Sequence, residues 1–327
     1  MNQSPNDPFT QEIRLLRADY EGKKERSNLG YSGGRRIIDL SLDMIDNVLC
    51  YTYWYERQCI RLADIPGTLS GDVLRLHQNL PVSVDAGDHE IIGDQIRAIE
   101  NALPLPELDD DSEELDTILA SLPIVEVDPS KHFVKQGKYK SEIRNLLECQ
   151  GGSCPGVAKS SHIIQLLGKS PEGRLVFERF KPRYVLGYIY PLATYKDWIL
   201  QIISAMKWVH SLGTIHRELR IDNIVFSSDT SRVLICDLES RWGNRLAPEV
   251  SREPVLNAGW TEKSDVYDLG YLIKGMIYGN VPVTNAVEWP VPLPLTAVVE
   301  TCTRNRPEDR ASLDEIYAMV DNIKIAI

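Results

Sequence analysis

The sequence predicts an α+β protein in which a two-lobed domain follows a mainly helical N-terminal region. The first observation is length, because a chain of 327 residues is long enough for two compact domains. The second is the order of elements in residues 117–327, where strand-like segments come first and helix-like segments follow. The third is a strongly acidic, proline-containing stretch at 104–116, which separates the two parts.

Residues 1–110 carry no motif that can be translated into chemistry. Residues 1–34 are polar and contain a Ser-Gly-Gly run, which predicts a flexible N-terminus. In residues 35–103 the apolar side chains between positions 35 and 63 recur at spacings that suit one long amphipathic helix or two short ones. Short apolar segments separated by Pro-Gly and Ala-Gly turns follow. We therefore expect this region to be mainly helical.

The stretch PLPELDDDSEELD at 104–116 holds seven carboxylates and two prolines. Like charges repel one another and keep such a segment extended in water, so the pattern predicts a solvated linker at the domain boundary. A metal site or a docking site for a basic partner is the alternative interpretation.

The overall charge bounds the kind of partner. The chain has 36 basic and 47 acidic residues, which gives 36 − 47 = −11. Nucleic acids and anionic lipid surfaces select basic proteins, so neither is an expected partner, although Lys135, Lys138 and Lys140 could form a local basic patch. There is no secretory apolar region near the start and no apolar window long enough to span a membrane. Six cysteines without a C-x-x-C pair are typical of reduced thiols, so we expect a cytoplasmic protein.

Residues 117–327 contain the strongest local patterns. The first part, 117–180, is rich in strand-like segments, and the second, 181–327, contains a long apolar helix that ends at a glycine. The expected strands are 123–127, 132–136, 163–167 and 174–180, and the expected helices are 141–149 and 195–212.

Five short motifs follow one another in the second part. Together they resemble the conserved segments of eukaryotic-type protein kinases, in the family's order and on the expected elements. His216, Arg217, Leu219 and Asn223 match the catalytic loop H-R-D-L-x-x-x-N position for position. The five segments are IHRELRIDNIVF (215–226), LICDLE (234–239), LAPEV (246–250), KSDVYDLGYLI (263–273) and NRPEDRAS (305–312).

The resemblance implies a bilobal kinase-like fold with an N-lobe at 117–180 and a C-lobe at 181–327. It also implies a site for ATP and Mg²⁺. Lys135 in HFVK would hold the α- and β-phosphates, and Glu142 would be its partner. Asn223 and Asp237 would coordinate Mg²⁺ through oxygen atoms.

The resemblance assigns further roles around this site. Glu218 stands where the family has its catalytic aspartate and would be the base, and Arg220 stands where many members have a phosphate-contacting lysine. Asp265 would tie the catalytic loop together. Glu249 and Arg310 would form a buried structural pair.

Two departures from the family pattern concern the nucleotide. No glycine occurs between Ser112 and Lys135, so the Gly-rich loop that covers the phosphates is missing. The D-F-G motif is replaced by Asp237-Leu238-Glu239, which puts an extra carboxylate near the phosphates unless Arg241 or another cation offsets it. Both changes predict weak or absent nucleotide binding.

Three further departures concern phosphoryl transfer. Glu218 is one methylene longer than the family's aspartate, and misplacing a catalytic group by about 1 Å can cost roughly a hundredfold in rate. Glu249 follows Asp237 by only twelve positions, which leaves little room for a peptide-substrate platform. The stretch from Gly279 to Pro292 is also short, so a peptide-docking helix of the C-lobe is expected to be absent.

Three hypotheses are therefore open, and they leave it undecided whether the chain is an enzyme. The first is a degenerate kinase, a pseudokinase that acts as a scaffold or switch for a protein partner and binds ATP and Mg²⁺ weakly or not at all. The second is an active atypical kinase that uses Glu218 as base on a small or recessed substrate. The third is a kinase fold repurposed for nucleotidyl, aminoacyl or peptide-forming transfer.

Overall fold

The computed structural model describes residues 7–26, 29–30, 37–55, 58–76, 80–81, 87–105, 107, 110–152, 160–243, 245–253, 255, 257–280, 282–284, 287 and 289–325. The chain forms two compact units. The larger unit comprises Met1–Ile13, Asp111–Gly279 and Pro290–Ile327, and the smaller unit comprises Arg14–Asp110 and Asn280–Trp289. The division between Asp110 and Asp111 falls inside the acidic stretch.

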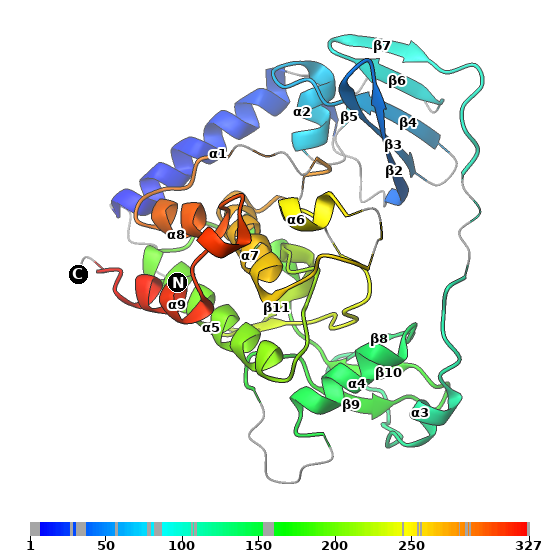
Figure 1. Cartoon of the computed structure of the whole chain (residues 1–327), viewed down its shortest axis with the longest axis vertical. Helices are drawn as coiled ribbons and strands as arrows, with labels where there is room; N and C mark the ends of the chain where they lie inside the picture. The colour runs from blue at the N-terminus through cyan, green and yellow to red at the C-terminus, as the bar shows by residue number, and fades with distance from the viewer. Residues whose placement is uncertain are drawn as a thin grey trace. The chain divides into compact units, whose positions relative to one another are not determined.

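A five-stranded sheet with the order β2-β3-β4-β6-β7 forms the smaller unit (Figure 1). All neighbouring strands are antiparallel except β4 and β6, which are parallel. Helix α2 (Leu69–Arg75) packs on β4 and β6. A separate two-stranded pair is formed by β1 (Leu29–Gly30) and β5 (Leu80–Pro81). The strands of the main sheet are β2 (Ile37–Ile45), β3 (Val48–Tyr55), β4 (Gln58–Ala63), β6 (His89–Ile92) and β7 (Gln95–Ala98).

The helix predicted for residues 35–63 is wrong, because this region folds as β2, β3 and β4. Asp46 and Asn47, with φ of 51° and 61°, make the two-residue turn between β2 and β3. Positive φ at both positions is the mark of a tight hairpin turn whose twist matches that of the strands. The alternating Tyr51 and Tyr53 are buried in the core with residues of β4, β6 and α2. Cys50, Thr52 and Trp54 are buried as well, so burial along β3 does not alternate, and the aromatic and β-branched residues favour a strand.

The flexible N-terminus predicted for residues 1–34 is also wrong over much of its length, because Pro8–Arg26 forms helix α1. Phe9, Ile13 and Tyr20 are buried at spacings of four and seven, which places them on one helical face. In the larger unit the Phe9 ring lies 5.7 Å from that of Tyr195. Burial of these apolar side chains stabilises a helix that also carries many charged residues.

The short stretch after Gly279 belongs to the smaller unit. Val283 lies in its core, and the Val283 N–H donates to the carbonyl of Leu74 at 2.7 Å. The Tyr51 and Thr284 hydroxyls are 3.2 Å apart. No helix occurs among the described residues between Gly279 and Leu295, and Asn280–Trp289 packs in the smaller unit instead of the C-lobe.

The N-lobe of the larger unit is a three-stranded antiparallel sheet, with β10 between β8 and β9. Helix α4 (Lys140–Cys149), close to the predicted 141–149, packs beside β9. The expected strand at 123–127 is reduced to one bridge, between Ile124 and Lys169. In the described residues, β8 is an edge strand with nothing paired on its outer side. The remaining elements are α3 (Asp116–Ala120), β8 (His132–Lys135), β9 (Leu166–Lys169) and β10 (Leu175–Glu178).

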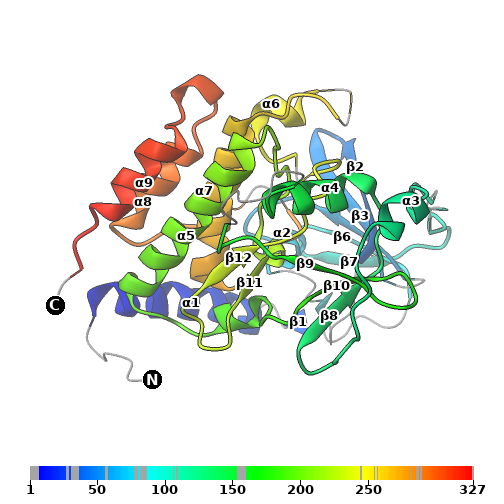
Figure 2. The ribbon, with the colours of Figure 1, turned by 90° about the horizontal axis from the view of Figure 1, so that it is seen from below.

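The C-lobe is mainly helical. Helix α5 packs on α9, and α7 packs on α8, as both views show (Figure 2). A Thr261–Ser264 capping box begins α7, and Gly279 with φ of 63° ends it. The elements are η1 (Arg183–Gly187), α5 (Leu192–Ser211), η2 (Ile221–Asn223), β11 (Ile224–Phe226), β12 (Val233–Ile235), α6 (Pro248–Ser251), α7 (Glu262–Tyr278), α8 (Leu295–Cys302), η3 (Pro307–Asp309) and α9 (Leu313–Asp321).

A β-rich N-lobe joined to a helical C-lobe confirms the predicted bilobal kinase-like fold. The long C-lobe helix predicted for 195–212 begins three residues earlier and ends just before Gly213, whose φ of 75° is a conformation that glycine adopts without strain. Of the helices in the described part of the chain, none combines the length and the apolar character that crossing a bilayer requires.

Candidate functional site

Four side chains from three parts of the larger unit converge between the lobes and form what we call the Lys135 cluster: Lys135, Glu142, Asp237 and Glu239. The Lys135 ammonium, at the end of β8, lies 2.9 Å from Oε1 of Glu142 on α4. It also bonds Oδ1 of Asp237, and Oε1 of Glu239 is 3.4 Å away. The fold thus unites Lys135, Glu142 and Asp237, three of the residues that the sequence nominated, and adds Glu239 to them.

Three carboxylates around one ammonium make the Lys135 cluster acidic, with a formal charge of +1 − 3 = −2 when all are ionised. Burial alone would lower the pKa of Lys135, but attraction by Glu142 and Asp237 outweighs it and raises the pKa. Burial, and then repulsion by Asp237, raise the pKa of Glu239 to about 7. The site therefore resists a third full negative charge near neutral pH.

Glu142 is the most enclosed member of the Lys135 cluster. Its side chain is 2% exposed, and burial raises its pKa despite the neighbouring Lys135. Its second oxygen, Oε2, has no hydrogen-bond partner among the described residues. A buried carboxylate oxygen without a partner is costly, so Glu142 depends on Lys135 for compensation.

The backbone conformation after β12 determines where the side chains of Asp237 and Glu239 lie. Asp237 has φ of 64° and Ser240 has φ of 52°, whereas Glu239 is not in the left-handed region. The turn that glycine makes in the family's D-F-G is therefore made here by other residues, and glutamate fits without backbone strain. The amide of Asn145 on α4 donates to the Leu238 carbonyl at 2.7 Å, which fixes the segment to α4.

A set of oxygen ligands is present in the Lys135 cluster. One carboxylate oxygen each from Glu142, Asp237 and Glu239 lies within 4.8 Å of the others. Carboxylates are the donors that Mg²⁺ and Ca²⁺ prefer, so the residues fit a divalent cation. Lys135, however, already contacts all three side chains and supplies the positive charge itself.

The catalytic-loop segment is held by Asp265 at the start of α7. Asp265 is fully buried, and its Oδ2 accepts from the His216 N–H at 2.7 Å and lies 2.8 Å from Nε2 of His210. Its Oδ1 accepts from the Arg217 N–H at 2.8 Å. The prediction that Asp265 ties this loop together is confirmed. Arg217 has φ of 71°, a strained conformation that these bonds help to maintain.

The remaining predicted site residues lie along this loop. The Asn223 amide donates to the carbonyl of Glu218 at 2.9 Å. The Cys236 N–H donates to the carbonyl of Asn223 at 2.9 Å, which brings Asn223 beside the strand that leads to Asp237. The Glu218 side chain is partly exposed, with Oε1 at 3.6 Å from the Arg220 guanidinium.

Arg220 is itself occupied. Its Nη2 donates to Oδ2 of Asp222 at 2.8 Å, and its Nε donates to the same oxygen at 3.2 Å. Arg183 also lies 3.1 Å from Asp222, so two guanidiniums share this carboxylate. Contact with a phosphate would have to compete with these bonds.

The short segment between Asp237 and α6 is packed down on the C-lobe. Gly243 lies so close to the Arg217 carbonyl and the Trp260 ring that a Cβ would come within 2.3 Å of each. Arg310 and Glu249 form a bidentate pair at 2.6 and 2.7 Å, which confirms the predicted structural pair. The segment is therefore anchored at both ends.

Sequence reasoning missed two groups of functional interest. It treated Glu239 only as a departure from glycine and not as a ligand of Lys135. It also placed Asp111 and Glu113 in a solvated linker, although both contact residues of the larger unit. Arg241, which was considered as a counter-charge for Glu239, pairs instead with Glu113. No local pattern reveals these pairings, because the partners are distant in sequence, from 28 positions for Asp111 and Tyr139 to 128 positions for Glu113 and Arg241.

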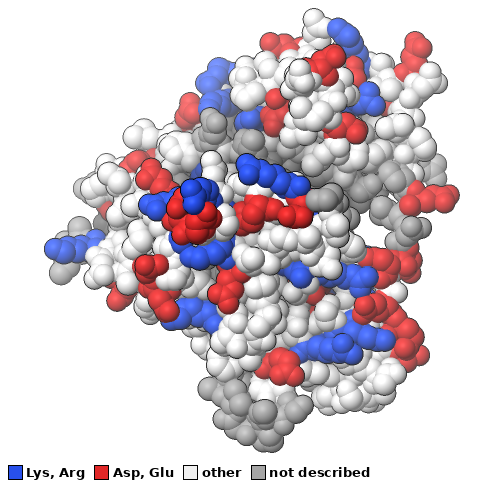
Figure 3. Space-filling model, in the orientation of Figure 1, with Lys and Arg blue, Asp and Glu red and all other residues white. Residues whose placement is uncertain are grey.

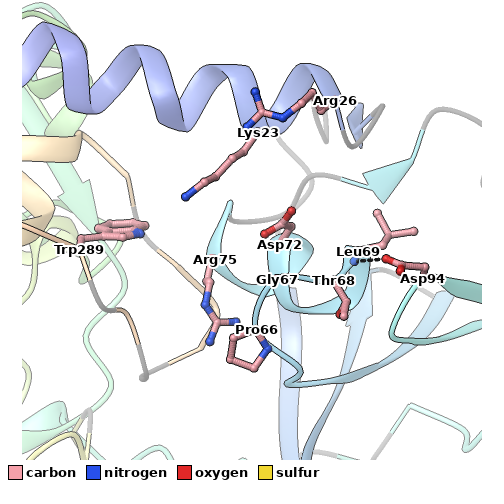
Figure 4. Close-up of a pocket in the computed structure, with 10 residues that line it drawn as sticks. All are labelled: Lys23, Arg26, Pro66, Gly67, Thr68, Leu69, Asp72, Arg75, Asp94 and Trp289. Carbon is pink, nitrogen blue, oxygen red and sulfur yellow. Dashed lines mark hydrogen bonds between the residues drawn. The ribbon is translucent and has the colours of Figure 1, made fainter.

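A hollow of about 630 Å³ lies within the smaller unit (Figure 4). It is lined by charges of both signs, and Arg75 already pairs with Asp64 at 2.8 Å. The Leu69 N–H donates to Asp94 at 2.9 Å. No sequence motif marks this hollow as a site.

Comparisons with known proteins agree with the fold. No family model matches the chain. A probable LIM domain-containing serine/threonine-protein kinase of Dictyostelium discoideum is 25% identical over 180 residues, covering 47% of this chain and 27% of that protein. A mitogen-activated protein kinase kinase kinase of Caenorhabditis elegans is 28% identical over 120 residues, covering 33% and 20%. A further probable serine/threonine-protein kinase of Dictyostelium discoideum is 24% identical over 224 residues, covering 60% and 16%.

The chain is kinase-like. Similarity to proteins named as kinases and the bilobal fold support this statement independently. The matches span only 16% to 27% of the length of these three relatives.

Proposed function

We propose that this protein is a pseudokinase, a kinase-like scaffold or switch whose nucleotide cleft is occupied by its own carboxylates. The observation that carries the proposal is the contact of Lys135 with Glu142, Asp237 and Glu239 together. In a working kinase this lysine grips phosphates and this aspartate holds Mg²⁺. Here each satisfies the other, and Glu239 adds a negative charge beside them.

Electrostatics supports weak or absent ATP binding. A triphosphate would enter a cluster that is already negative, with a formal charge of −2 when Glu239 is ionised and −1 when it is protonated, and charge repulsion is strong where water is partly excluded. Mg²⁺ would have to compete with Lys135 for the same three carboxylates. The role we propose therefore needs neither ATP nor Mg²⁺.

The N-lobe offers no compensation for this loss. Residues 122–131 include one bridge to β9 and a tight turn, in which the Ser130 N–H donates to the Asp128 side chain at 2.9 Å. No hairpin rich in glycine occurs among the described residues of this lobe. The backbone N–H groups that would cradle phosphates in a kinase have no counterpart there.

Thermal unfolding tests this proposal. Wild-type protein is melted with Mg-ATP at millimolar concentration, with Mg²⁺ alone and with ATP plus chelator. Saturating ligand at 100 times its Kd would stabilise the fold by about 2.7 kcal/mol, which corresponds to roughly 5–10 °C for a unit of this size. We expect a shift below 1 °C. A Mg²⁺-dependent rise of several degrees that Lys135→Ala abolishes would overturn the proposal.

One observation favours a second candidate, an active atypical kinase. Lys135 is paired with Glu142, and Asp265 accepts hydrogen bonds from the loop that carries Glu218. The Glu218 carboxylate on this loop is partly exposed. If Glu218 were the base, Glu218→Gln would abolish phosphoryl transfer and Glu218→Asp would preserve or raise it. Equal low activity in all three proteins would leave the pseudokinase as the better account.

A further inference from the structure

The acidic stretch makes a specific contact through Asp111, the first residue of the larger unit after the smaller one. Oδ2 of Asp111 accepts from the Tyr139 hydroxyl at 2.6 Å and from the Trp242 indole at 3.2 Å. Oδ1 lies 2.5 Å from the Lys138 ammonium. Hydrogen bonds from Lys138 and Tyr139 lower the pKa of Asp111, so the carboxylate stays ionised. One side chain thus bridges two distant parts of the chain.

Glu113 makes a second bridge between the same two parts. Its Oε2 accepts from the backbone N–H of Lys140, the first residue of α4, at 2.7 Å. Its Oε1 accepts from the Arg241 guanidinium at 2.7 Å. The Glu113 N–H also donates to the Lys138 carbonyl at 2.9 Å, which fixes the backbone of the acidic stretch. A carboxylate on the first N–H groups of a helix is favourable for the helix dipole as well.

The Arg241 guanidinium also contacts two aromatic rings in this region. The Arg241 guanidinium lies 4.6 Å from the centre of the Tyr139 ring and 5.6 Å from that of Trp242. Trp242 also donates to the Tyr139 hydroxyl at 3.1 Å. Figure 3 shows basic side chains directly beside acidic ones over the region of α3 and α4. The contacts join three segments: 111–113, the start of α4, and 241–242 in the segment that follows Asp237.

We propose that Asp111 and Glu113 form an acidic latch that holds the start of α4 against residues 241–242 and so positions Glu142 against Lys135. Glu142 lies in the first turn of α4, two residues after Lys140. A shift of that turn would move the Glu142 carboxylate away from the ammonium and loosen the Lys135 cluster. The latch lies where the chain enters the larger unit, so the segment from the smaller unit is covalently joined to it.

This inference adds a structural mechanism to the proposed switch. It rests on the proposed function only in the purpose that it assigns to the latch. The latch itself does not require that nucleotide bind or fail to bind. Its test therefore measures α4 and Lys135 in the full chain without any nucleotide. A wrong proposed function would appear as Mg-ATP binding, and a wrong latch would appear as an unchanged α4.

Hydrogen exchange followed by mass spectrometry provides the first readout. The variant is Asp111→Ala with Glu113→Ala, and the matched control is Glu107→Ala with Glu126→Ala, which removes the same charge from exposed positions on either side of the latch. We expect amides of 140–149 and 238–243 to exchange at least tenfold faster in the latch variant only. Amides of α9 should be unchanged, because that helix touches none of these residues.

Labelling of Lys135 by an amine-acylating reagent provides the second readout. In the wild type three carboxylates engage this ammonium, so the latch variant should be labelled several-fold faster at Lys135 and equally at the exposed Lys131. If the double alanine variant does not fold, Glu113→Gln with Trp242→Phe removes the Arg241 charge partner and the indole donor with less disruption. Unchanged exchange in α4 and unchanged Lys135 labelling in a folded variant would overturn the latch, as would equal acceleration in α9.

Discussion

The two lobes of the larger unit match the kinase pattern to different degrees. In the C-lobe, the polar framework is complete: Asp265 binds the catalytic loop, and Arg310 binds Glu249 through two hydrogen bonds. In the N-lobe, the strands that would cover a nucleotide are absent from the described residues, and Lys135 is engaged by carboxylates. The difference teaches that the motif residues of the C-lobe are bonded to the fold itself, whereas Lys135 in the N-lobe is bonded to carboxylates where a kinase would bind phosphate.

The largest effect is expected from the C-lobe framework. Asp265→Ala leaves two buried backbone N–H groups and His210 without their acceptor, which should cost about 3–5 kcal/mol of unfolding free energy. Urea unfolding measures the loss of stability. The control is Asp314→Ala, which changes an exposed side chain of α9 and should have an effect below about 0.5 kcal/mol. If the Asp265 variant were as stable as the control, the framework would not be what holds the C-lobe.

A smaller effect is expected at Glu239 and depends on pH. Its pKa is raised to about 7 in the folded state from an ordinary value of 4.5, so the folded state retains a proton that the unfolded state has lost between these values. Stability attributable to Glu239 therefore falls as pH rises from 4.5 to 7, by at most about 3 kcal/mol.

Glu239→Gln removes this dependence. The variant should be more stable than wild type at pH 8, and the difference should vanish near pH 4.5. Urea unfolding across this range measures the effect, with Glu126→Gln, an exposed change in the same lobe, as control. If wild type were as stable as Glu239→Gln at pH 8, or more stable, Lys135 would fully compensate the third carboxylate. The N-lobe would then differ less from the C-lobe than we propose.

The smallest effect is expected at the acidic latch. Glu113 and Arg241 are each about 35% exposed, so solvent screens their attraction and their coupling energy should be the smallest of the three effects. A double-mutant cycle of Glu113→Gln and Arg241→Gln in urea measures it. A coupling of zero would assign the role of Glu113 to its bond with the Lys140 N–H alone.

The sequence predicted the C-lobe well because its signals are local. The catalytic-loop residues, Asp265 and the Glu249–Arg310 pair each lie in a short motif, and the long helix ends at a glycine. The β2–β4 region was mistaken for helix because apolar residues in dense runs fit both periods, and the Asp46-Asn47 turn was not recognised. Glu239 and the acidic latch could not be predicted because their partners are distant in sequence and depend on the tertiary fold.

The central claim is that carboxylates, above all Glu239, exclude nucleotide from Lys135. Calorimetric titration of Mg-ATP at pH 8 into wild type and Glu239→Gly tests it most directly, with Lys135→Ala added to the second protein as control. The account predicts no measurable binding, or at least tenfold weaker binding, in wild type than in Glu239→Gly, and no binding once Lys135 is removed. Equal Mg-ATP affinity of wild type and Glu239→Gly would contradict it.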